Sequence, residues 1–144
     1  MTAVTSSLIG RSVHSLPTPV AVLDDAALEH NLALMASWCR ERGVELQPHG
    51  KTTMAPALFA RQLAAGATGI TAATPAQVRV MRSHGVPAVQ LANELVQPGP
   101  ASWIAGEVAA GFGFRCWVDS VDGVEVLQAA FGGAGAVADV LVEV

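Results

Sequence analysis

The sequence predicts an α/β protein, namely a partial (β/α)₈ TIM barrel of about six βα units that is truncated before barrel closure. Apolar runs of strand length alternate with helical segments, and a glycine follows most of these helices. This alternation indicates parallel strands joined by helical crossovers. The sixth run reaches Val144 with no helix after it, whereas a closed barrel needs eight strands. We therefore expect a fragment of a barrel.

An open, doubly wound sheet is the alternative architecture. Its dinucleotide-binding form needs a G-x-G-x-x-G fingerprint directly after the first strand, and none is present there. The expected strands cover residues 20–23, 44–47, 69–72, 87–91, 112–118 and 139–144. The expected helices cover residues 25–42, 55–65, 75–84, 101–110 and 120–130.

Local signals set the ends of these elements. Residues 1–16 are polar and are expected to form an N-terminal arm, while residues 17–144 form the barrel part. Asp24 or Asp25 is expected to cap the first helix, and Gly43 to end it. Further expected signals are the Thr74-Pro75 helix start with Gln77 completing a capping box, a cap at Asp119-Ser120, and a helix break at Gly132-Gly133.

Composition narrows the class of protein. Of the 144 residues, 51% are hydrophobic and 14% are charged, which is typical of a folded domain. A net charge of −4 argues against nucleic acid or an anionic membrane as a partner. No apolar run approaches the ~20 residues that span a bilayer. The two cysteines are far apart in the sequence, so no disulfide framework or zinc motif is expected, and the predicted location is the cytoplasm.

Lys51 is the only lysine in the sequence. It follows an expected strand, precedes an expected helix, and has His49 two residues before it. A lysine amine becomes a nucleophile or base when burial lowers its pKa, so this position suits imine chemistry. The alternative is that Lys51 is an ordinary surface charge.

Other polar side chains follow the expected strands, where the active face of a barrel lies. They are Asp24, His49 with Lys51, residues 71–74, Asn93 with Glu94, and Asp119. Asp24, Thr74 and Asp119 also fit as helix caps. Asn93 and Glu94 directly follow an apolar strand, which favours a site.

Several motifs together resemble one enzyme family. They are Thr18–Asp24, Asn31-Leu32, Pro48-His49-Gly50-Lys51-Thr52, Gln62–Ala67 and Leu91–Glu94. These motifs resemble the N-terminal barrel of fold-type III, alanine-racemase-like pyridoxal-phosphate enzymes, in the branch of D-threonine aldolase and D-serine dehydratase. The sequence of residues 49–56 is similar to that of amino acid deaminases, or D-serine deaminase-like proteins.

The resemblance implies a function and a site. Lys51 would carry pyridoxal 5'-phosphate as a Schiff base, and His49, Thr52 and Asn93 match the motifs as cofactor-binding residues. The implied activity is that of a deaminase (ammonia-lyase) on D-amino acids such as D-serine, in a full-length protein that is a homodimer. Zinc would be bound by a histidine and a cysteine of a C-terminal β-domain, so no metal ligand is expected in this chain, which alone would be inactive.

Two other functions remain open at this stage. A D-threonine aldolase-type lyase would break the Cα–Cβ bond instead of releasing the β-hydroxyl. A related barrel family binds pyridoxal phosphate without a clear reaction and serves cofactor homeostasis. The residues that distinguish these functions are expected to lie past Val144.

Overall fold

The computed structural model describes residues 8–144, which divide into two compact units at Asn31 and Leu32. The first unit contains the 3₁₀-helix η1 (Val13–Ser15), an extended segment and the start of α1 (Asp25–Arg42). Part of the predicted arm, residues 1–7, lies outside the described residues. The strand expected over residues 20–23 is wrong, because this extended segment pairs with no strand among the described residues.

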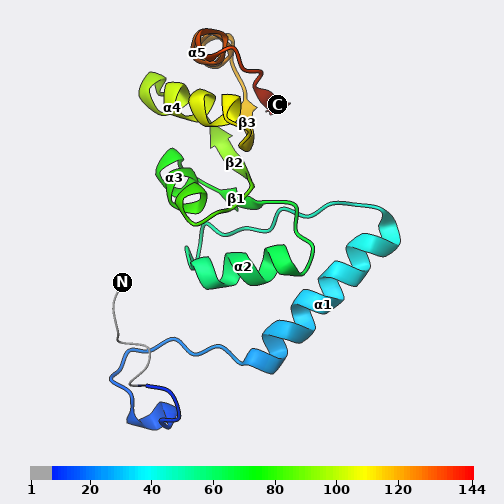
Figure 1. Cartoon of the computed structure of the whole chain (residues 1–144), viewed down its shortest axis with the longest axis vertical. Coiled ribbons are helices and arrows are strands. Elements are labelled where there is room, and N and C mark those ends of the chain that lie inside the picture. The colour runs from blue at the N-terminus through cyan, green and yellow to red at the C-terminus, as the bar shows by residue number, and fades with distance from the viewer. Residues whose placement is uncertain (1–7) are drawn as a thin grey trace. The chain divides into compact units, whose positions relative to one another are not determined.

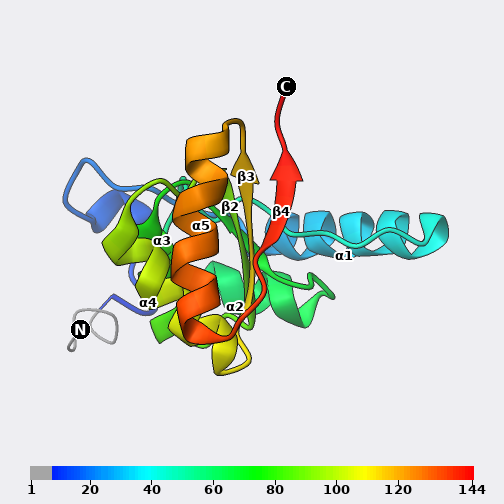
Figure 2. The ribbon, with the colours of Figure 1, turned by 90° about the horizontal axis from the view of Figure 1, so that it is seen from above.

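The second unit is built on a parallel sheet of four strands in the order β1-β2-β3-β4, with β1 to β3 labelled in Figure 1 and β4 in Figure 2. The strands are β1 (Ile70–Ala72), β2 (Ala88–Glu94), β3 (Gly113–Val118) and β4 (Asp139–Val142). The strand order follows the sequence without the reversal that defines a doubly wound sheet. The predicted fold class is therefore confirmed as part of a barrel, and the sheet is open within the described residues.

Helices connect the strands of this unit, and α3, α4 and α5 lie on the same side of the strands (Figure 2). The helices after α1 are α2 (Pro56–Ala64), α3 (Pro75–Ser83), α4 (Pro98–Ala109) and α5 (Val121–Ala134). Right-handed crossovers between sequential parallel strands place every helix on one face. No helix in the described part of the chain is long and apolar enough to cross a membrane.

Two helix boundaries differ from the sequence-based expectation. Helix α4 begins at Pro98, three residues early, because proline fits the first turn, where a helix leaves its N–H groups unpaired. Helix α5 continues through Gly132-Gly133 and ends at Ala134, where Gly135, with a φ of +65°, forms the C-cap. Glycine in a helix costs about 1 kcal/mol, which burial of Phe131 on the same turn offsets.

The strand expected over residues 44–47 is replaced by a shorter pairing further along. Thr68 N donates to Leu46 O at 3.0 Å, and Thr71 N donates to Pro48 O at 2.8 Å. His49 forms a single parallel bridge with Thr71. Pro48 has no N–H to donate, so this segment runs beside β1 without becoming a full strand.

The two faces of the sheet differ in polarity. On β1, β2 and β3, strand residues on the helix side are buried, among them Ile70, Val89, Leu91, Phe114 and Cys116. On the opposite face, one row of the register joins Thr71, Gln90, Arg115 and Asp139, and Thr71 is bridged to His49. Side chains that are paired in register point to the same side of a sheet. A polar row therefore crosses the face that a closed barrel would turn inward.

Candidate functional site

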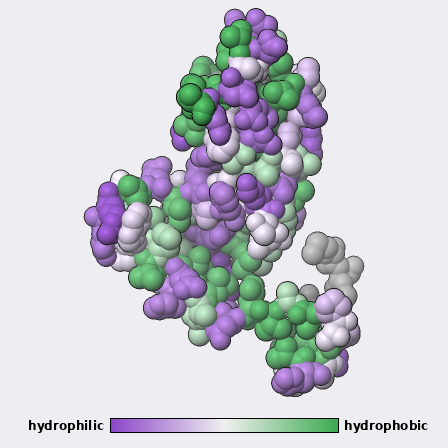
Figure 3. Space-filling view, turned by 180° about the vertical axis from the view of Figure 1, so that it is seen from behind, coloured by the Kyte–Doolittle hydropathy of each residue, from purple (hydrophilic) through white to green (hydrophobic). Residues whose placement is uncertain are grey.

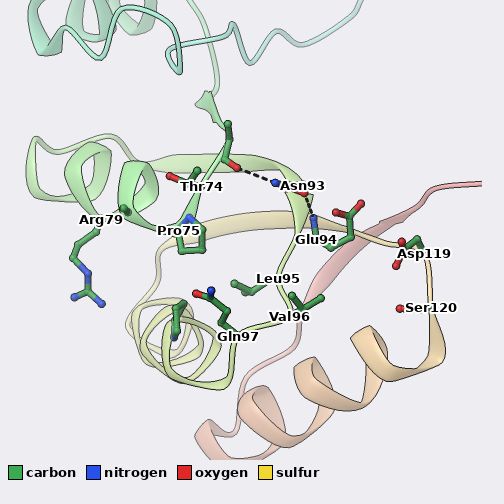
Figure 4. Close-up of a pocket in the computed structure, with 13 residues that line it drawn as sticks. Thr74, Pro75, Arg79, Asn93, Glu94, Leu95, Val96, Gln97, Asp119 and Ser120 are labelled. Atoms are coloured by element: carbon green, nitrogen blue, oxygen red, sulfur yellow. Dashed lines mark hydrogen bonds between the residues drawn. The ribbon is translucent and has the colours of Figure 1, made fainter.

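The carboxyl ends of β1, β2 and β3 surround a cavity of about 770 Å³. Its polar lining comes from the end of β2, from α3 and from the segments that precede α3, α4 and α5. The polar residues labelled in Figure 4 are Thr74, Arg79, Asn93, Glu94, Gln97, Asp119 and Ser120. Arg79 lies on the opposite side of this cavity from Asp119 (Figure 4). Ligand sites of barrels occupy this end of the sheet. We call the cavity and the neighbouring Lys51 turn (residues 49–54) the candidate site.

Several of the predicted polar residues cap helices. Asp24 Oδ1 accepts from Ala27 N at 2.9 Å, in the first unit. Thr74 Oγ1 accepts from Gln77 N at 3.3 Å. The cap of α5 is Ser120, whose Oγ accepts from Gly123 N at 3.3 Å. Asp119 is therefore not the cap and remains a charged group at the cavity.

Asn93 and Glu94 belong to β2, although the sequence placed them after its end. The register shifts between the pairs Leu91–Cys116 and Glu94–Trp117, which leaves residues 92 and 93 unpaired in a bulge. There Asn93 Nδ2 donates to Ala73 O at 3.2 Å, and Asn93 Oδ1 accepts from Glu94 N at 3.0 Å. The Asn93 side chain thus joins the ends of β1 and β2 and keeps one N–H for another partner.

The Lys51 turn is fixed to the core through Gly50, which is buried. A Cβ at this position would lie 2.5 Å from Ile70 Cγ2 and 2.6 Å from Phe59 Cε1. Gly50 N donates to Thr71 O at 3.0 Å, and Met54 N donates to Gly50 O at 2.9 Å. Because Gly50 faces the core, its neighbours in an extended segment face away from it. His49 is exposed and Lys51 is half-buried.

Gln77 connects the Lys51 turn to the cavity. Its Nε2 donates to Lys51 O at 3.1 Å, and its Oε1 accepts from Ala73 N at 2.8 Å. The expected capping box would have placed Oε1 on Thr74 N instead. Ala73 lines the cavity and also accepts from Asn93. The capping pattern identified Gln77, but no sequence signal indicated its contact with Lys51.

The structure links some of the predicted site residues to one another and leaves others apart. Lys51 and Asn93 are joined through Gln77 and Ala73, although Lys51 does not line the cavity. His49 bridges Thr71 at the start of the same turn. Thr52 is exposed, and no described hydrogen bond fixes its side chain. Asp24 lies in the other unit.

Among the described residues, the pKa of one side chain, Cys116, is strongly shifted. Burial, and secondarily the charge of Glu94, raise the pKa of the Cys116 thiol to about 11. Cys116 is fully buried on the helix side of β3, so its thiol stays protonated at neutral pH. Among residues 8–144, no group of three or more histidine, cysteine, aspartate or glutamate side chains has the arrangement of a metal site.

Comparison with known proteins gives relatives for nearly the whole chain, although no protein-family model matches it. D-threonine aldolase of Arthrobacter sp. is 33% identical over 135 residues, which are 94% of this chain and 35% of that protein. D-threo-3-hydroxyaspartate dehydratase of Delftia sp. (strain HT23) is 43% identical over 60 residues, which are 42% of this chain and 16% of that protein.

Solved structures give the same result. The crystal structure of D-threonine aldolase from Filomicrobium marinum matches 89% of this chain with a TM-score of 0.82 and 35% identity. D-threo-3-hydroxyaspartate dehydratase from Delftia sp. HT23 matches 89% with a TM-score of 0.77 and 29% identity. The chain spans about a third of the length of these relatives (34% of each solved chain). It is therefore similar in sequence and in fold to about a third of the length of D-threonine aldolase and D-threo-3-hydroxyaspartate dehydratase.

Proposed function

We propose that this chain is the lysine-bearing part of a pyridoxal-phosphate-dependent lyase that acts on β-hydroxy D-amino acids. The observation that carries the proposal is the position of Lys51, the single lysine, in an anchored turn beside the carboxyl end of β1. The names of the relatives support the substrate class, because D-threonine and D-threo-3-hydroxyaspartate both carry a hydroxyl on the β-carbon.

The described residues fit this cofactor in part. Lys51 supplies the primary amine that a covalent link to an aldehyde requires, and it is half-buried. Asn93 retains one N–H donor, and Arg79 is the cation among the described residues that line the cavity. Partners for the phosphate and the ring nitrogen are expected in the remaining two thirds of the length of the relatives.

Each predicted site residue has a separate role in this proposal. Bound at Lys51, the cofactor supplies the electron sink that makes the α-proton of an amino acid acidic. Lys51 Nζ would hold the cofactor, and as a free amine it would be the base that takes up that proton. His49 supports the turn from the polar face of the sheet, and Thr52 and Asn93 contact the cofactor.

D-serine deamination is the reaction that we favour for this site, because residues 49–56 are similar to D-serine deaminase-like proteins. Loss of the β-hydroxyl would lead to a keto acid and ammonia. D-threonine aldolase-type cleavage is the second candidate, favoured by the 33% identity over 94% of the chain. A homodimer in the cytoplasm, with zinc bound by residues outside this chain, completes the proposal for the full-length protein.

Borohydride reduction of the full-length protein with pyridoxal phosphate tests the anchor. Peptide mapping is expected to find the pyridoxyl group on the peptide that contains Lys51. Lys51→Arg is expected to abolish this labelling, since guanidinium stays protonated in proteins. Labelling of another amine alone, with none on Lys51, contradicts the proposal.

Product analysis then distinguishes the two reactions. With D-serine, a deaminase releases ammonia and a keto acid in equal amounts, whereas an aldolase with D-threonine releases glycine and an aldehyde. Matched incubations with the L-amino acids are the control for stereochemistry. Cofactor binding without either product would favour the homeostasis function.

A further inference from the structure

The hydrogen bonds around the Lys51 turn single out a side chain that the proposed chemistry does not use. Gly50 and Met54, on either side of Lys51, are held by backbone hydrogen bonds. The carbonyl of Lys51 itself is held by a side chain, Gln77 Nε2, at 3.1 Å and across 26 residues of sequence. The orientation of the Lys51 peptide therefore depends on the side chain of α3.

Both ends of the Gln77 amide are engaged. Its oxygen accepts from Ala73 N at 2.8 Å, and this bond fixes the amide so that its nitrogen faces Lys51 O. A carboxamide is needed for this pair of contacts, because one partner is a donor and the other an acceptor. Gln77 is half-buried in the first turn of α3, so its side chain has little freedom to leave.

The same contact reaches the second predicted cofactor residue. Ala73 N donates to Gln77 Oε1 at 2.8 Å, and Ala73 O accepts from Asn93 Nδ2 at 3.2 Å. The Lys51 turn, the end of β1 and the bulge of β2 are thereby joined through one residue, Ala73. A shift of the Gln77 amide would move Lys51 relative to Asn93.

We propose that Gln77 is a positioning residue for Lys51, one that sets the direction in which the lysine side chain leaves the turn. This inference deepens the proposed function and rests on it for the meaning of the lysine. Both ends of the Gln77 amide are already engaged by protein groups, so the proposed role needs no contact with substrate or cofactor. Its effect passes through the Lys51 carbonyl, which fixes the backbone from which the amine extends.

The variant Gln77→Glu separates this role from a role in starting the helix. A glutamate keeps the size of the side chain, keeps an acceptor for Ala73 N, and adds a favourable negative charge to the first turn of α3. It has no donor for Lys51 O, and its carboxylate repels that carbonyl. We expect its melting temperature to stay near that of the wild type.

Arg82→Ala is the matched control on the same helix. Arg82 Nε pairs with Glu107 Oε2 at 2.8 Å in the last turn of α3, away from the Lys51 turn. This variant lowers the stability of α3 packing and leaves the Gln77 contacts in place. A general loosening of α3 would therefore appear in both variants.

Hydrogen exchange of the full-length protein without cofactor is the first measurement. Exchange at the amides of Gly50 and Met54 is expected to become about five- to tenfold faster in Gln77→Glu, as loss of one hydrogen bond predicts. It is expected to stay at the wild-type rate in Arg82→Ala. Equal exchange of this segment in Gln77→Glu and wild type would overturn the inference.

Cofactor capture is the second measurement. The apparent dissociation constant for pyridoxal phosphate, followed by borohydride trapping on the Lys51 peptide, is expected to rise about five- to tenfold in Gln77→Glu and to be unchanged in Arg82→Ala. An unchanged constant in Gln77→Glu would also overturn the inference. If the wild type captures no cofactor at Lys51, the proposed function fails, and the exchange comparison still decides whether Gln77 positions the lysine.

Discussion

At the scale of single residues, Gly50 carries a steric constraint that tests the Lys51 turn. A Cβ there would approach Ile70 Cγ2, Phe59 Cε1 and Met81 Cε to between 2.5 and 3.0 Å. We expect Gly50→Ala to lower the free energy of unfolding by about 2 kcal/mol, because the core residues have no room to move. Urea denaturation of the full-length protein measures this.

Gly106→Ala is the control for that substitution. Gly106 lies in α4 with nothing within 4 Å of an added Cβ. Alanine favours a helix over glycine by about 1 kcal/mol, so this variant should be slightly more stable than the wild type. If both variants gained stability, the tight packing of Gly50 would be refuted.

His49 gives a second test on the same turn. It is exposed and lies opposite Thr71, held there by the hydrogen bonds of its neighbours Pro48 and Gly50. We expect its imidazole to support the cofactor without taking part in proton transfer. His49→Ala should weaken pyridoxal phosphate binding moderately, by about tenfold or less, as expected for one lost polar contact. Turnover at saturating cofactor should be retained. Loss of turnover with unchanged cofactor affinity would assign the imidazole a chemical role.

The buried thiol of Cys116 predicts a pH dependence. Its pKa is about 11 in the folded chain, above the ordinary value of 9.0. Between these two values the unfolded chain has lost the proton that the folded chain keeps, so stability falls as pH rises. The contribution is fully present below pH 9 and is lost as pH rises towards 11.

Urea unfolding between pH 8 and 11 tests this dependence. The measurement is made on the full-length protein, and the comparison with Cys116→Ala separates the Cys116 thiol from other groups that titrate in that window. Cys116→Ala is expected to be less stable throughout and to show a flatter decline with pH. A decline as steep as that of the wild type would assign the effect to other groups.

At the scale of the element, the start of α5 distinguishes two adjacent residues. Ser120 Oγ accepts from Gly123 N, whereas Asp119 lines the cavity. Ser120→Ala should lower the free energy of unfolding by about 1 kcal/mol through loss of the cap. Asp119→Ala should change it by less, and a larger loss in that variant would restore Asp119 as the cap.

Local sequence predicted helix ends more reliably than it predicted strands. Thr74, Pro75 and Gly43 marked helix ends because caps act within one turn of the chain. The apolar run at 20–23 also has the composition of a strand, but a strand forms only against a partner. Its neighbours in a barrel would be the second and the last strand, and it pairs with neither among the residues described.

At the scale of the whole molecule, the outer edge of β4 is the clearest liability. All four of its residues are exposed, and Val142 is 76% exposed. The C-terminal end of the chain, near the top of Figure 3, presents hydrophobic side chains at its surface. Apolar parallel edges of this kind pair with other chains. We expect the 144-residue chain, expressed alone, to self-associate and to release no keto acid from D-serine.

Sedimentation velocity of the isolated chain measures this association. Val142→Lys places a charge on the edge strand and should raise the monomer fraction, because an edge lysine opposes pairing. Val80→Lys adds the same charge to the exposed surface of α3 and should leave association unchanged. A monodisperse wild-type monomer with cooperative unfolding would contradict the prediction.

Much of the secondary structure of this protein is determined by residues that lie close together in the chain. The sequence predicted the repeating units, most helix caps, the Lys51 turn and the family resemblance. Each of these depends on contacts within one turn of the chain or on a short sequence motif. The four later strands could be read as well, because their apolar composition coincided with available partners.

Contacts between distant residues were decided by the tertiary structure alone. The register set the polar row from Thr71 to Asp139, and the bulge placed Asn93 against Ala73. The bond from Gln77 to Lys51 spans 26 residues. Such contacts depend on how strands align and helices pack, and a shift of one residue in register would turn each side chain to the other face. No local pattern encodes that alignment, because the packing of the whole sheet against its helices selects it.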